Sequence, residues 1–344
     1  MRLLFVTHRY PPHTGGVETH VRQLAIRLAD CGHDVVVFSA DAGGDVPSVR
    51  MDDGVRVRRF RSLSPSGAFY LAPQLTLAVR RANADVVHAH NYHAFPLFFA
   101  ALGVAEERFV VTTHYHGASS SDFRDALLSL YRPLGRWAIQ KADAVIAVSD
   151  WEQERLQADF GIDAEVIPNG VDTERFADAE PEQRDRPYLL CVGRLEKYKG
   201  VQHVVRVLPE LPNYDLVVAG SGPYRAELER IAREEGVVDR VDFLGYVTDE
   251  RLPGLYAGAE VYVTMSEFEA YGMTVAEALA AGTSCVVRKA GALRDWSDKD
   301  GVRGIETLSH QELAAALHWA VSHVPTSTQT PTWDEIVEQV VQVY

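Results

Sequence analysis

The sequence predicts an α/β protein built from two doubly wound parallel-sheet domains. Short apolar runs alternate with helical patterns in both halves of the chain, and this alternation is typical of a parallel sheet covered by helices on both faces. A polar stretch with two prolines, residues 178–187, separates the halves. A chain of 344 residues also exceeds what one hydrophobic core usually organises, which favours two domains.

The first domain is predicted over residues 1–177. It begins with a strand at Leu3–Val6, and a loop containing Gly15 and Gly16 leads into a helix over about Val17–Asp30. That helix has apolar residues on one face, and Gly32 ends it. The later strands of this domain are expected at Asp34–Ser39, Val55–Arg61, Ala84–His88, Phe109–Thr113, Ala144–Val148 and Glu165–Ile167.

The second domain is predicted over residues 188–330. Helices are expected after Gly200, at Arg225–Glu235 and at about Gly272–Ala281. A proline-containing break then precedes an amphipathic helix at Trp333–Tyr344, within the terminal segment 331–344. The strands of this domain are expected at Tyr188–Val192, Asp215–Ala219, Val241–Leu244, Val261–Thr264 and Ser284–Arg288.

Composition narrows the possible partners and location. The formal net charge is −14, which argues against nucleic acid because phosphate binding needs a basic surface. The three cysteines are far apart and form no C-x-x-C pair, as expected in a reducing compartment. No apolar run approaches the about 18 residues of a membrane span. We therefore expect a cytoplasmic protein, attached at most to the inner membrane surface.

Three loops at predicted carboxyl ends of strands are candidates for phosphate binding, since ligands of doubly wound sheets bind there. The first contains Gly15 and Gly16 and opens a helix, whose N-terminal amides can bind an anion. A tight helix entry explains these glycines equally well. The loop lacks the G-x-G-x-x-G pattern, which argues against a nicotinamide dehydrogenase.

The second loop runs from Gly193 to Gly200 and carries Arg194 and Lys199. A diphosphate can accept two parallel hydrogen bonds from the forked guanidinium of an arginine and a third from the compact ammonium of a lysine. The alternative is that both cations are simply solvated. Their position after a strand and between two glycines favours an anion site.

The third loop follows Val261–Thr264 and places Glu269 just before a helix and Glu277 inside it. The first amides of that helix, those of Gly272, Met273 and Thr274, are free to bind an anion. A carboxylate beside them can accept hydrogen bonds from sugar hydroxyls. Alternatively, Glu269 is an N-terminal helix charge and Glu277 a solvated residue.

Together these loops resemble the retaining glycosyltransferases of family 4, which have the GT-B fold. Glu269 and Glu277 match its E-x7-E motif, and the loop from Gly193 to Gly200 matches its G-R-x-x-x-x-K-G motif. The segment Ile167–Asp172 matches I-P-N-G-V-D. The resemblance covers nearly the whole chain and implies two Rossmann-like domains facing across a cleft. It also implies that the last helix crosses back to the first domain.

The resemblance further implies metal-independent, retaining transfer of a hexosyl group from a nucleotide-diphosphate sugar of UDP or GDP type to a saccharide or lipid-linked acceptor, with no cofactor. A sugar-nucleotide epimerase or hydrolase on the same fold is the alternative. By this resemblance, Arg194 and Lys199 bind the diphosphate, Glu277 binds the ribose and Glu269 contacts the transferred sugar. The phosphates or the sugar are contacted by Gly272, Met273, Thr274 and Gly16. The base is contacted by Tyr246 and Val247.

Histidines add two hypotheses. His114 ends the predicted strand Phe109–Thr113, where the resembled family commonly has a histidine near the sugar; a structural histidine under a loop is the alternative. His88-Ala89-His90 suggests a metal, but neighbours at a strand end point to opposite faces. We therefore predict no metal site.

A basic strand in the first domain suggests membrane contact. Arg56, Arg58, Arg59 and Arg61 lie together, and the apolar stretch from Phe69 to Val79 follows. Basic and apolar residues together can rest on an anionic membrane. The alternative is that the arginines of an edge strand face water while the apolar stretch belongs to the core.

Overall fold

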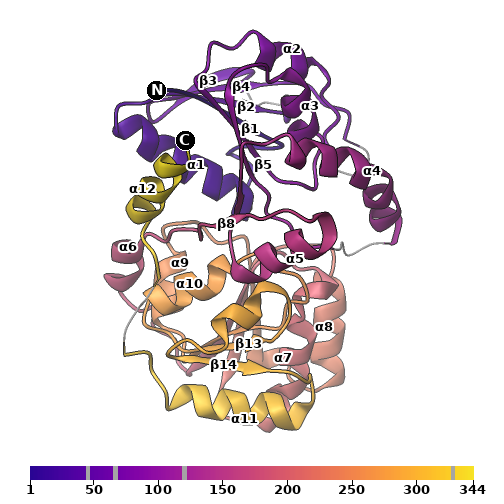
Figure 1. Cartoon of the computed structure of the whole chain (residues 1–344). Coiled ribbons are helices and arrows are strands. Elements are labelled where there is room, and N and C mark those ends of the chain that lie inside the picture. Colours follow the sequence, from indigo (N-terminus) through magenta and orange to yellow (C-terminus); the bar gives the residue numbers. More distant parts are fainter. Residues whose placement is uncertain (44–46, 65–68, 118–121, 327–329) are drawn as a thin grey trace. The chain divides into compact units, whose positions relative to one another are not determined.

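The computed structural model describes residues 1–43, 47–64, 69–117, 122–326 and 330–344. The chain forms two compact units (Figure 1). Unit 1 contains residues 1–170 together with Trp333–Tyr344, and unit 2 contains Val171–Thr332. The division therefore falls at residue 170, before the polar stretch 178–187 that was expected to be the linker.

Unit 1 is built on an eight-stranded sheet in the order β3-β4-β2-β1-β5-β6-β7-β8. Every neighbouring pair is parallel except β3 with β4. The strands are β1 (Arg2–Thr7), β2 (Asp34–Ser39), β3 (Val49–Asp52), β4 (Val55–Arg59), β5 (Val86–His90), β6 (Arg108–Thr112), β7 (Ala144–Ala147) and β8 (Glu165–Val166).

Helices cover both faces of this sheet, as alternation predicts. Leu4 and Val6 of β1 pack in one core cluster with α2 (Gln74–Arg80) and α3 (Pro96–Gly103), beside α4 (Asp122–Gln140). On the other face α1 (Gly16–Asp30) packs against β2 and against α12 (Trp333–Val343) (Figure 1). The remaining helix of unit 1 is α5 (Asp150–Phe160).

The helix α12 is fastened to unit 1 by apolar and polar contacts. Trp333, Ile336 and Val340 are buried, as the apolar stripe indicates. The hydroxyl of Tyr344 lies 2.8 Å from His88 Nδ1, and Arg108 Nε donates to the carbonyl of Val343 at 2.8 Å. These bonds join the end of the chain to β5 and β6.

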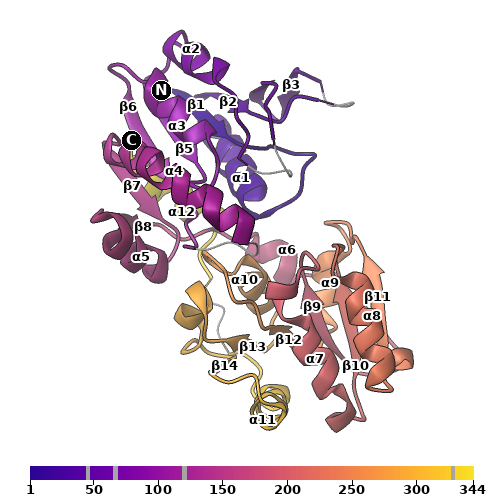
Figure 2. The same ribbon diagram turned by 90° about the vertical axis from the view of Figure 1, so that its right-hand side faces the viewer.

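Unit 2 is a six-stranded, wholly parallel sheet in the order β11-β10-β9-β12-β13-β14. Helices α7 and α8 lie side by side on one face (Figure 2), and α11 joins their core cluster. Helices α6, α9 and α10 pack together. The bounds are α6 (Thr173–Ala177), β9 (Tyr188–Val192), α7 (Val201–Val207), β10 (Asp215–Ala219), α8 (Arg225–Glu234), β11 (Val241–Gly245), α9 (Leu252–Ala257), β12 (Val261–Thr264), α10 (Met273–Ala280), β13 (Cys285–Arg288), β14 (Val302–Ile305) and α11 (His310–Val321).

The polar stretch 178–187 belongs to unit 2 because it is bonded there. The amide of Glu182 donates to the carbonyl of Gly254 at 2.8 Å, and its carboxylate pairs with Arg251 at 2.8 Å. A polar stretch with two prolines can resemble a linker in sequence and still be held by residues far along the chain.

Several strand bounds differ from the prediction. The strand β5 spans Val86–His90 rather than Ala84–His88, and the carboxylate of Asp85, just before it, accepts the Arg2 amide at 2.7 Å. The strand β4 ends at Arg59 rather than Arg61, and the antiparallel strand β3 was missed. Asp53 and Gly54 join β3 to β4 with φ of 43° and 83°, the positive values expected of an Asp-Gly hairpin turn.

No helix in the described ranges is both long and apolar enough to cross a membrane.

Candidate functional site

In unit 2 the loops at the carboxyl ends of neighbouring strands touch through glycines. Gly200 has φ 75°, and a Cβ there would lie 2.3 Å from the carbonyl oxygen of Met265, just beyond β12. A Cβ on Gly220, after β10, would lie 1.9 Å from the carbonyl oxygen of Gly193. Only glycine allows these backbone approaches. They bring the loop Gly193–Gly200 against the loops of both adjacent strands.

The Gly193–Gly200 loop brings Lys199 to Glu269. Lys199 Nζ lies 2.6 Å from Glu269 Oε1, and each side chain is about one-fifth exposed. Burial alone lowers the pKa of Lys199, but the charge and hydrogen bond of Glu269 outweigh it, so the pKa is raised. Two residues expected to bind different parts of one ligand therefore form an ion pair.

Arg194 is placed differently from Lys199. Its side chain is 61% exposed, and Nε lies 3.3 Å from Glu196 Oε1. Both cations nevertheless line one small cavity at the ends of β9 and β12, together with Thr264. An exposed arginine beside a held lysine can swing onto an anion without breaking any buried bond.

The helix α10 begins where the sequence places an anion site. It starts at Met273, with Gly272 as its N-cap at φ 100°. A Cβ at Gly272 would lie 3.1 Å from Leu293 Cδ2 and 3.2 Å from Trp296 Nε1. The first amides of a helix lack partners within it, so those of Met273 and Thr274 face outward from the helix end.

Glu277 lies one turn further along α10. Tyr256 donates its hydroxyl to Glu277 Oε2 at 2.9 Å. Burial raises the pKa of Glu277 to about 7, while the Tyr256 hydrogen bond opposes the rise. A carboxyl group in this setting accepts one protein hydroxyl and retains acceptor capacity for another.

The segment that begins at Ala290, where the sequence lacks the glutamate of the family 4 pattern, supports Glu269. The carbonyl of Glu269 accepts the Ala292 amide at 3.0 Å. A Cβ on Gly291, which has φ 56°, would lie 3.0 Å from both the nitrogen and the oxygen of Glu269. The sequence signal was the glycine in Ala290-Gly291-Ala292.

Tyr246 and Val247 follow the last residue of β11. Tyr246 is 63% exposed. The amide of Gly220 donates to the carbonyl of Gly245 at 2.7 Å. The end of β11 is thus joined through Gly220 to Gly193, so Tyr246 stands at the margin of the same group of loops.

Gly16 and Glu18 form the start of α1 in unit 1. Gly16 is the first helical residue and is exposed. Glu18 is buried, and its Oε1 lies 2.6 Å from Arg9 Nη2. A Cβ on Gly15 would lie 2.4 Å from Glu18 Oε2. Gly15 therefore makes room for a carboxylate of the protein itself, and only Gly16 leaves open space at this helix end.

His114 lies just beyond β6 among other buried histidines. Its ring is 4.8 Å from that of His20 and 6.1 Å from that of His90, measured between centroids. Burial holds the pKa of His114 and His90 well below the usual value and lowers that of His20 to about 4. All three rings are therefore neutral at pH 7.

The orientation argument for His88 and His90 was wrong. Residues two apart on a strand share a face, and the two rings lie 4.1 Å apart. One nitrogen from each of His20, His90 and His114 lies within 4.8 Å of the others. Tetrahedral zinc with bonds of about 2.1 Å needs ligand nitrogens roughly 3.4 Å apart. These three rings would therefore have to move closer to one another to bind it.

Glu152 is a further buried residue that sequence reasoning missed. Its carboxylate is fully buried and accepts hydrogen bonds from the Thr113 hydroxyl and the Tyr115 amide, on either side of His114. It also accepts the Val148 amide at 2.6 Å. The available signal was Ser149-Asp150-Trp151-Glu152, a capping-box pattern, and Ser149 Oγ does accept the Glu152 amide at 3.1 Å.

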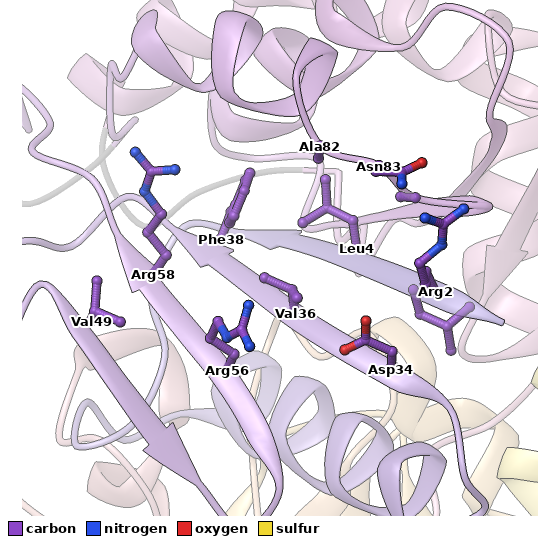
Figure 3. A pocket seen from close by; sticks show the side chains of 12 residues that line it. Arg2, Leu4, Asp34, Val36, Phe38, Val49, Arg56, Arg58, Ala82 and Asn83 are labelled. Atoms are coloured by element: carbon purple, nitrogen blue, oxygen red, sulfur yellow. The ribbon is translucent and has the colours of Figure 1, made fainter.

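A cavity of about 690 Å³ lies on unit 1 against β1, β2 and β4 (Figure 3). Leu4, Val36 and Phe38 line it together with the exposed Arg56 and Arg58. Arg56 is opposite Val36 and Arg58 opposite Phe38 in the parallel register. Arg58 also lies 4.8 Å from the centre of the Phe60 ring.

Much of the rest of the expected membrane surface is interior, although Arg61 and Leu77 are exposed. Arg59 is buried and its Nη1 lies 2.6 Å from Asp41 Oδ2. Phe69, Leu75 and Val79 belong to the core. Strand alternation accounts for Arg59, since Val55, Val57 and Arg59 all point inward.

Comparison with known proteins places this geometry in a family. Residues 14–175 match the model for Glycosyltransferase Family 4, and residues 172–329 match that for Glycosyl transferases group 1. A glycogen synthase of Mycobacterium tuberculosis is 31% identical over 85% of this chain and 79% of its own. A GDP-mannose-dependent alpha-(1-6)-phosphatidylinositol monomannoside mannosyltransferase of the same organism is 30% identical over 84% and 81%.

Solved structures agree on the fold. Sucrose-phosphate synthase from Thermosynechococcus elongatus superposes with a TM-score of 0.79 at 21% identity, over 100% of this chain and 98% of that one. Anabaena HepE, in complex with UDP and glucose, gives 0.78 at 20% identity over 100% and 99%. With two parallel α/β units of this kind and both family models matched in order, the chain belongs to the family 4, group 1 glycosyltransferases of the GT-B fold.

Proposed function

We propose that this glycosyltransferase moves a hexosyl group from a UDP or GDP sugar to a saccharide or lipid-linked acceptor, with retention and without a metal ion. The observation that carries the proposal is the Lys199–Glu269 pair, 2.6 Å apart, in the same unit as the α10 N-terminus. Support for the donor class comes from the relative named for GDP-mannose and from the fold neighbour bound to UDP.

The leaving diphosphate is the group that needs most stabilisation, because negative charge grows on it as the sugar departs. Lys199, Arg194 and the amides of Met273 and Thr274 supply positive charge and hydrogen-bond donors for that purpose. The acceptor oxygen then attacks from the face that the diphosphate leaves. No pair of carboxylates at glycosidase spacing is needed for this route.

The remaining site residues have narrower proposed roles. Glu277 binds the ribose hydroxyls, since its carboxyl accepts hydroxyl donors already. Glu269 contacts the transferred sugar, and Tyr246 and Val247 contact the base. From unit 1, Gly16 offers a free helix amide, and His114 acts as a neutral hydrogen-bonding ring.

We also propose that the acceptor is met at an anionic membrane. The cavity of Figure 3 combines an apolar floor with three arginines, Arg2, Arg56 and Arg58, against the one carboxylate of Asp34. A relative is named for a phosphatidylinositol monomannoside acceptor. This would make the protein a cytoplasmic enzyme bound peripherally to the inner face.

Donor-dependent stabilisation tests the proposal directly. The melting temperature should rise with one of UDP, GDP or ADP sugars far more than with the others, because a ligand that binds only the folded state stabilises by mass action. NMR of the product should then show the donor's anomeric configuration, and EDTA should leave the rate unchanged. Inversion, loss of the rate in EDTA, or release of free sugar without transfer would contradict the proposal.

A further inference from the structure

Glu152 holds the backbone on both sides of His114. One carboxylate oxygen, Oε1, accepts both the Thr113 hydroxyl and the Tyr115 amide. The other, Oε2, accepts the Val148 amide at 2.6 Å. Thr113 and Tyr115 follow β6, and Val148 follows β7, the neighbouring strand. One buried carboxylate thus joins the ends of two strands and holds the residues on either side of His114.

His114 needs such support because its backbone is strained. Its φ is 46°, in the left-handed region that non-glycine residues rarely occupy. The strands hold this turn from the other side as well. The Thr113 amide donates to the Ile146 carbonyl at 3.2 Å, and the Thr113 carbonyl accepts the Tyr92 amide at 2.7 Å. Without a fixed acceptor next to it, the turn could relax and rotate the ring.

We propose that Glu152 is a positioning residue, which sets the direction of the His114 ring for sugar transfer. The inference rests on the proposed role of His114 and adds a residue from α5 that does not itself contact substrate. Glu152 is fully buried, so it cannot meet a ligand except through the turn it holds.

The chemistry of the contact calls for a carboxylate. Three donors converge on two oxygens, and a carboxylate offers acceptors on both. Glutamine of the same length has one acceptor oxygen and an NH₂ group that would face a donor. Glu152→Gln should therefore break at least one of the three bonds while keeping the side-chain volume.

The test compares transfer kinetics of Glu152→Gln with the matched control Glu154→Gln, an exposed glutamate on the same helix. We expect kcat of Glu152→Gln to fall about tenfold to a hundredfold, as for a small misplacement of a catalytic group, with the donor KM changed less than about twofold. Glu154→Gln should match the unaltered enzyme. Unchanged kcat in Glu152→Gln beside an impaired His114→Ala would overturn the proposal.

A double-mutant cycle shows whether Glu152 acts through His114. Glu152→Gln should add no further loss to His114→Ala, because the ring it positions is gone. If the losses in kcat of the two single variants instead multiply in the double variant, Glu152 acts elsewhere, and the proposal is overturned. Full activity of His114→Ala would instead refute the role of His114 itself, while leaving the donor-site assignments in unit 2 intact.

Thr113→Val keeps the test decisive if Glu152→Gln does not fold. It removes one donor to Oε1 and preserves the shape of a buried side chain. The same pattern is expected, a lower kcat at nearly constant donor KM that disappears in the His114→Ala background. A Thr113→Val enzyme with normal kcat and a normal melting temperature would overturn the proposal.

Discussion

Lys199 and Glu269 are 70 residues apart in sequence, yet Lys199 Nζ lies 2.6 Å from Glu269 Oε1. In the proposed roles, Lys199 binds the diphosphate and Glu269 contacts the sugar, so this ion pair would couple the two parts of the donor site. A diphosphate that draws Lys199 toward itself would release Glu269 to accept a sugar hydroxyl. Binding of one part of the donor would thereby prepare the contact with the other.

Replacing the two cations should separate their contributions. Lys199→Ala should lower kcat at least about a hundredfold, since a donor to the developing charge is lost, and it leaves Glu269 unpaired. Arg194→Ala should lower kcat about tenfold with no change in melting temperature, because Arg194 is 61% exposed. Initial rates and thermal unfolding measure both effects. Near-normal turnover in the double variant would contradict the assignment.

The two glutamates should separate nucleotide binding from transfer. Glu277→Gln should weaken binding of the bare nucleoside diphosphate, because its carboxyl is proposed to accept ribose hydroxyls. Glu269→Gln should leave that binding nearly unchanged and lower transfer. Isothermal titration with UDP or GDP, alongside rate measurements, gives the comparison, and equal losses of affinity in both variants would exclude these roles.

Removing α12 should destabilise unit 1. A chain ending at Pro331 loses the buried Trp333, Ile336 and Val340, and exposes the face of α1 that packs on them. The melting temperature should fall by about ten degrees or more, since burying each of these three side chains is worth about 1.5–3 kcal/mol. Asp334→Asn is the control, because its pair with Arg27 is exposed and contributes at most about 1 kcal/mol. An unchanged melting curve would count against this packing.

Glu152 should make stability depend on pH. Burial raises its pKa to about 7 from 4.5, although the three hydrogen bonds to its carboxylate oppose the rise. The folded state therefore binds the proton more tightly than the unfolded state, and Glu152 becomes the ionised acceptor of its three donors as pH rises above about 7. Its stabilising contribution is fully present below pH 4.5 and is lost as pH rises through 7. Between those limits the stability difference between the unaltered protein and Glu152→Gln should shift by about 3 kcal/mol against the former. Chemical denaturation at pH 5 and pH 8 measures it, and a constant difference would refute the shift.

Membrane binding should depend on the arginines of the Figure 3 cavity. Arg56→Ser with Arg58→Ser should lower the affinity for anionic vesicles, measured by sedimentation, about twentyfold to thirtyfold, since each basic residue near the surface contributes about 1 kcal/mol. Arg225→Ser with Arg230→Ser, on α8, is the charge-matched control. Equal binding by both double variants, or binding to neutral vesicles, would argue against this surface. Arg59 is unsuitable for the test, because its buried pair with Asp41 supports the fold.

Local sequence patterns predicted the strands whose bounds are set by their own residues and immediate neighbours. The strands β2, β10 and β12 have the predicted bounds, because each is a short apolar run between polar or glycine residues. The edge strand β14 was missed because Arg303 and Gly304 interrupt its apolar run. Its helix neighbour α11 was not singled out either.

The site was predictable to the extent that motifs mark backbone geometry. Gly193, Gly200 and Gly272 all adopt positive φ, as their positions in the loops suggest. The ion pair of Lys199 with Glu269, and the contacts of Glu152 around His114, depend on which strands become neighbours. Those contacts arise from the order of the strands in each sheet, which the spacing of residues in the sequence does not predict.

Because α12 belongs to unit 1, unit 2 is inserted into unit 1 along the chain. Residues 333–344 leave the ribosome only after all of residues 171–332 have been made. Unit 2 can therefore complete its sheet during synthesis. The apolar face of α1 stays uncovered until the segment beginning at Trp333 has been made. A chain cut short just before Trp333 would accordingly lack a part of the unit that is made first.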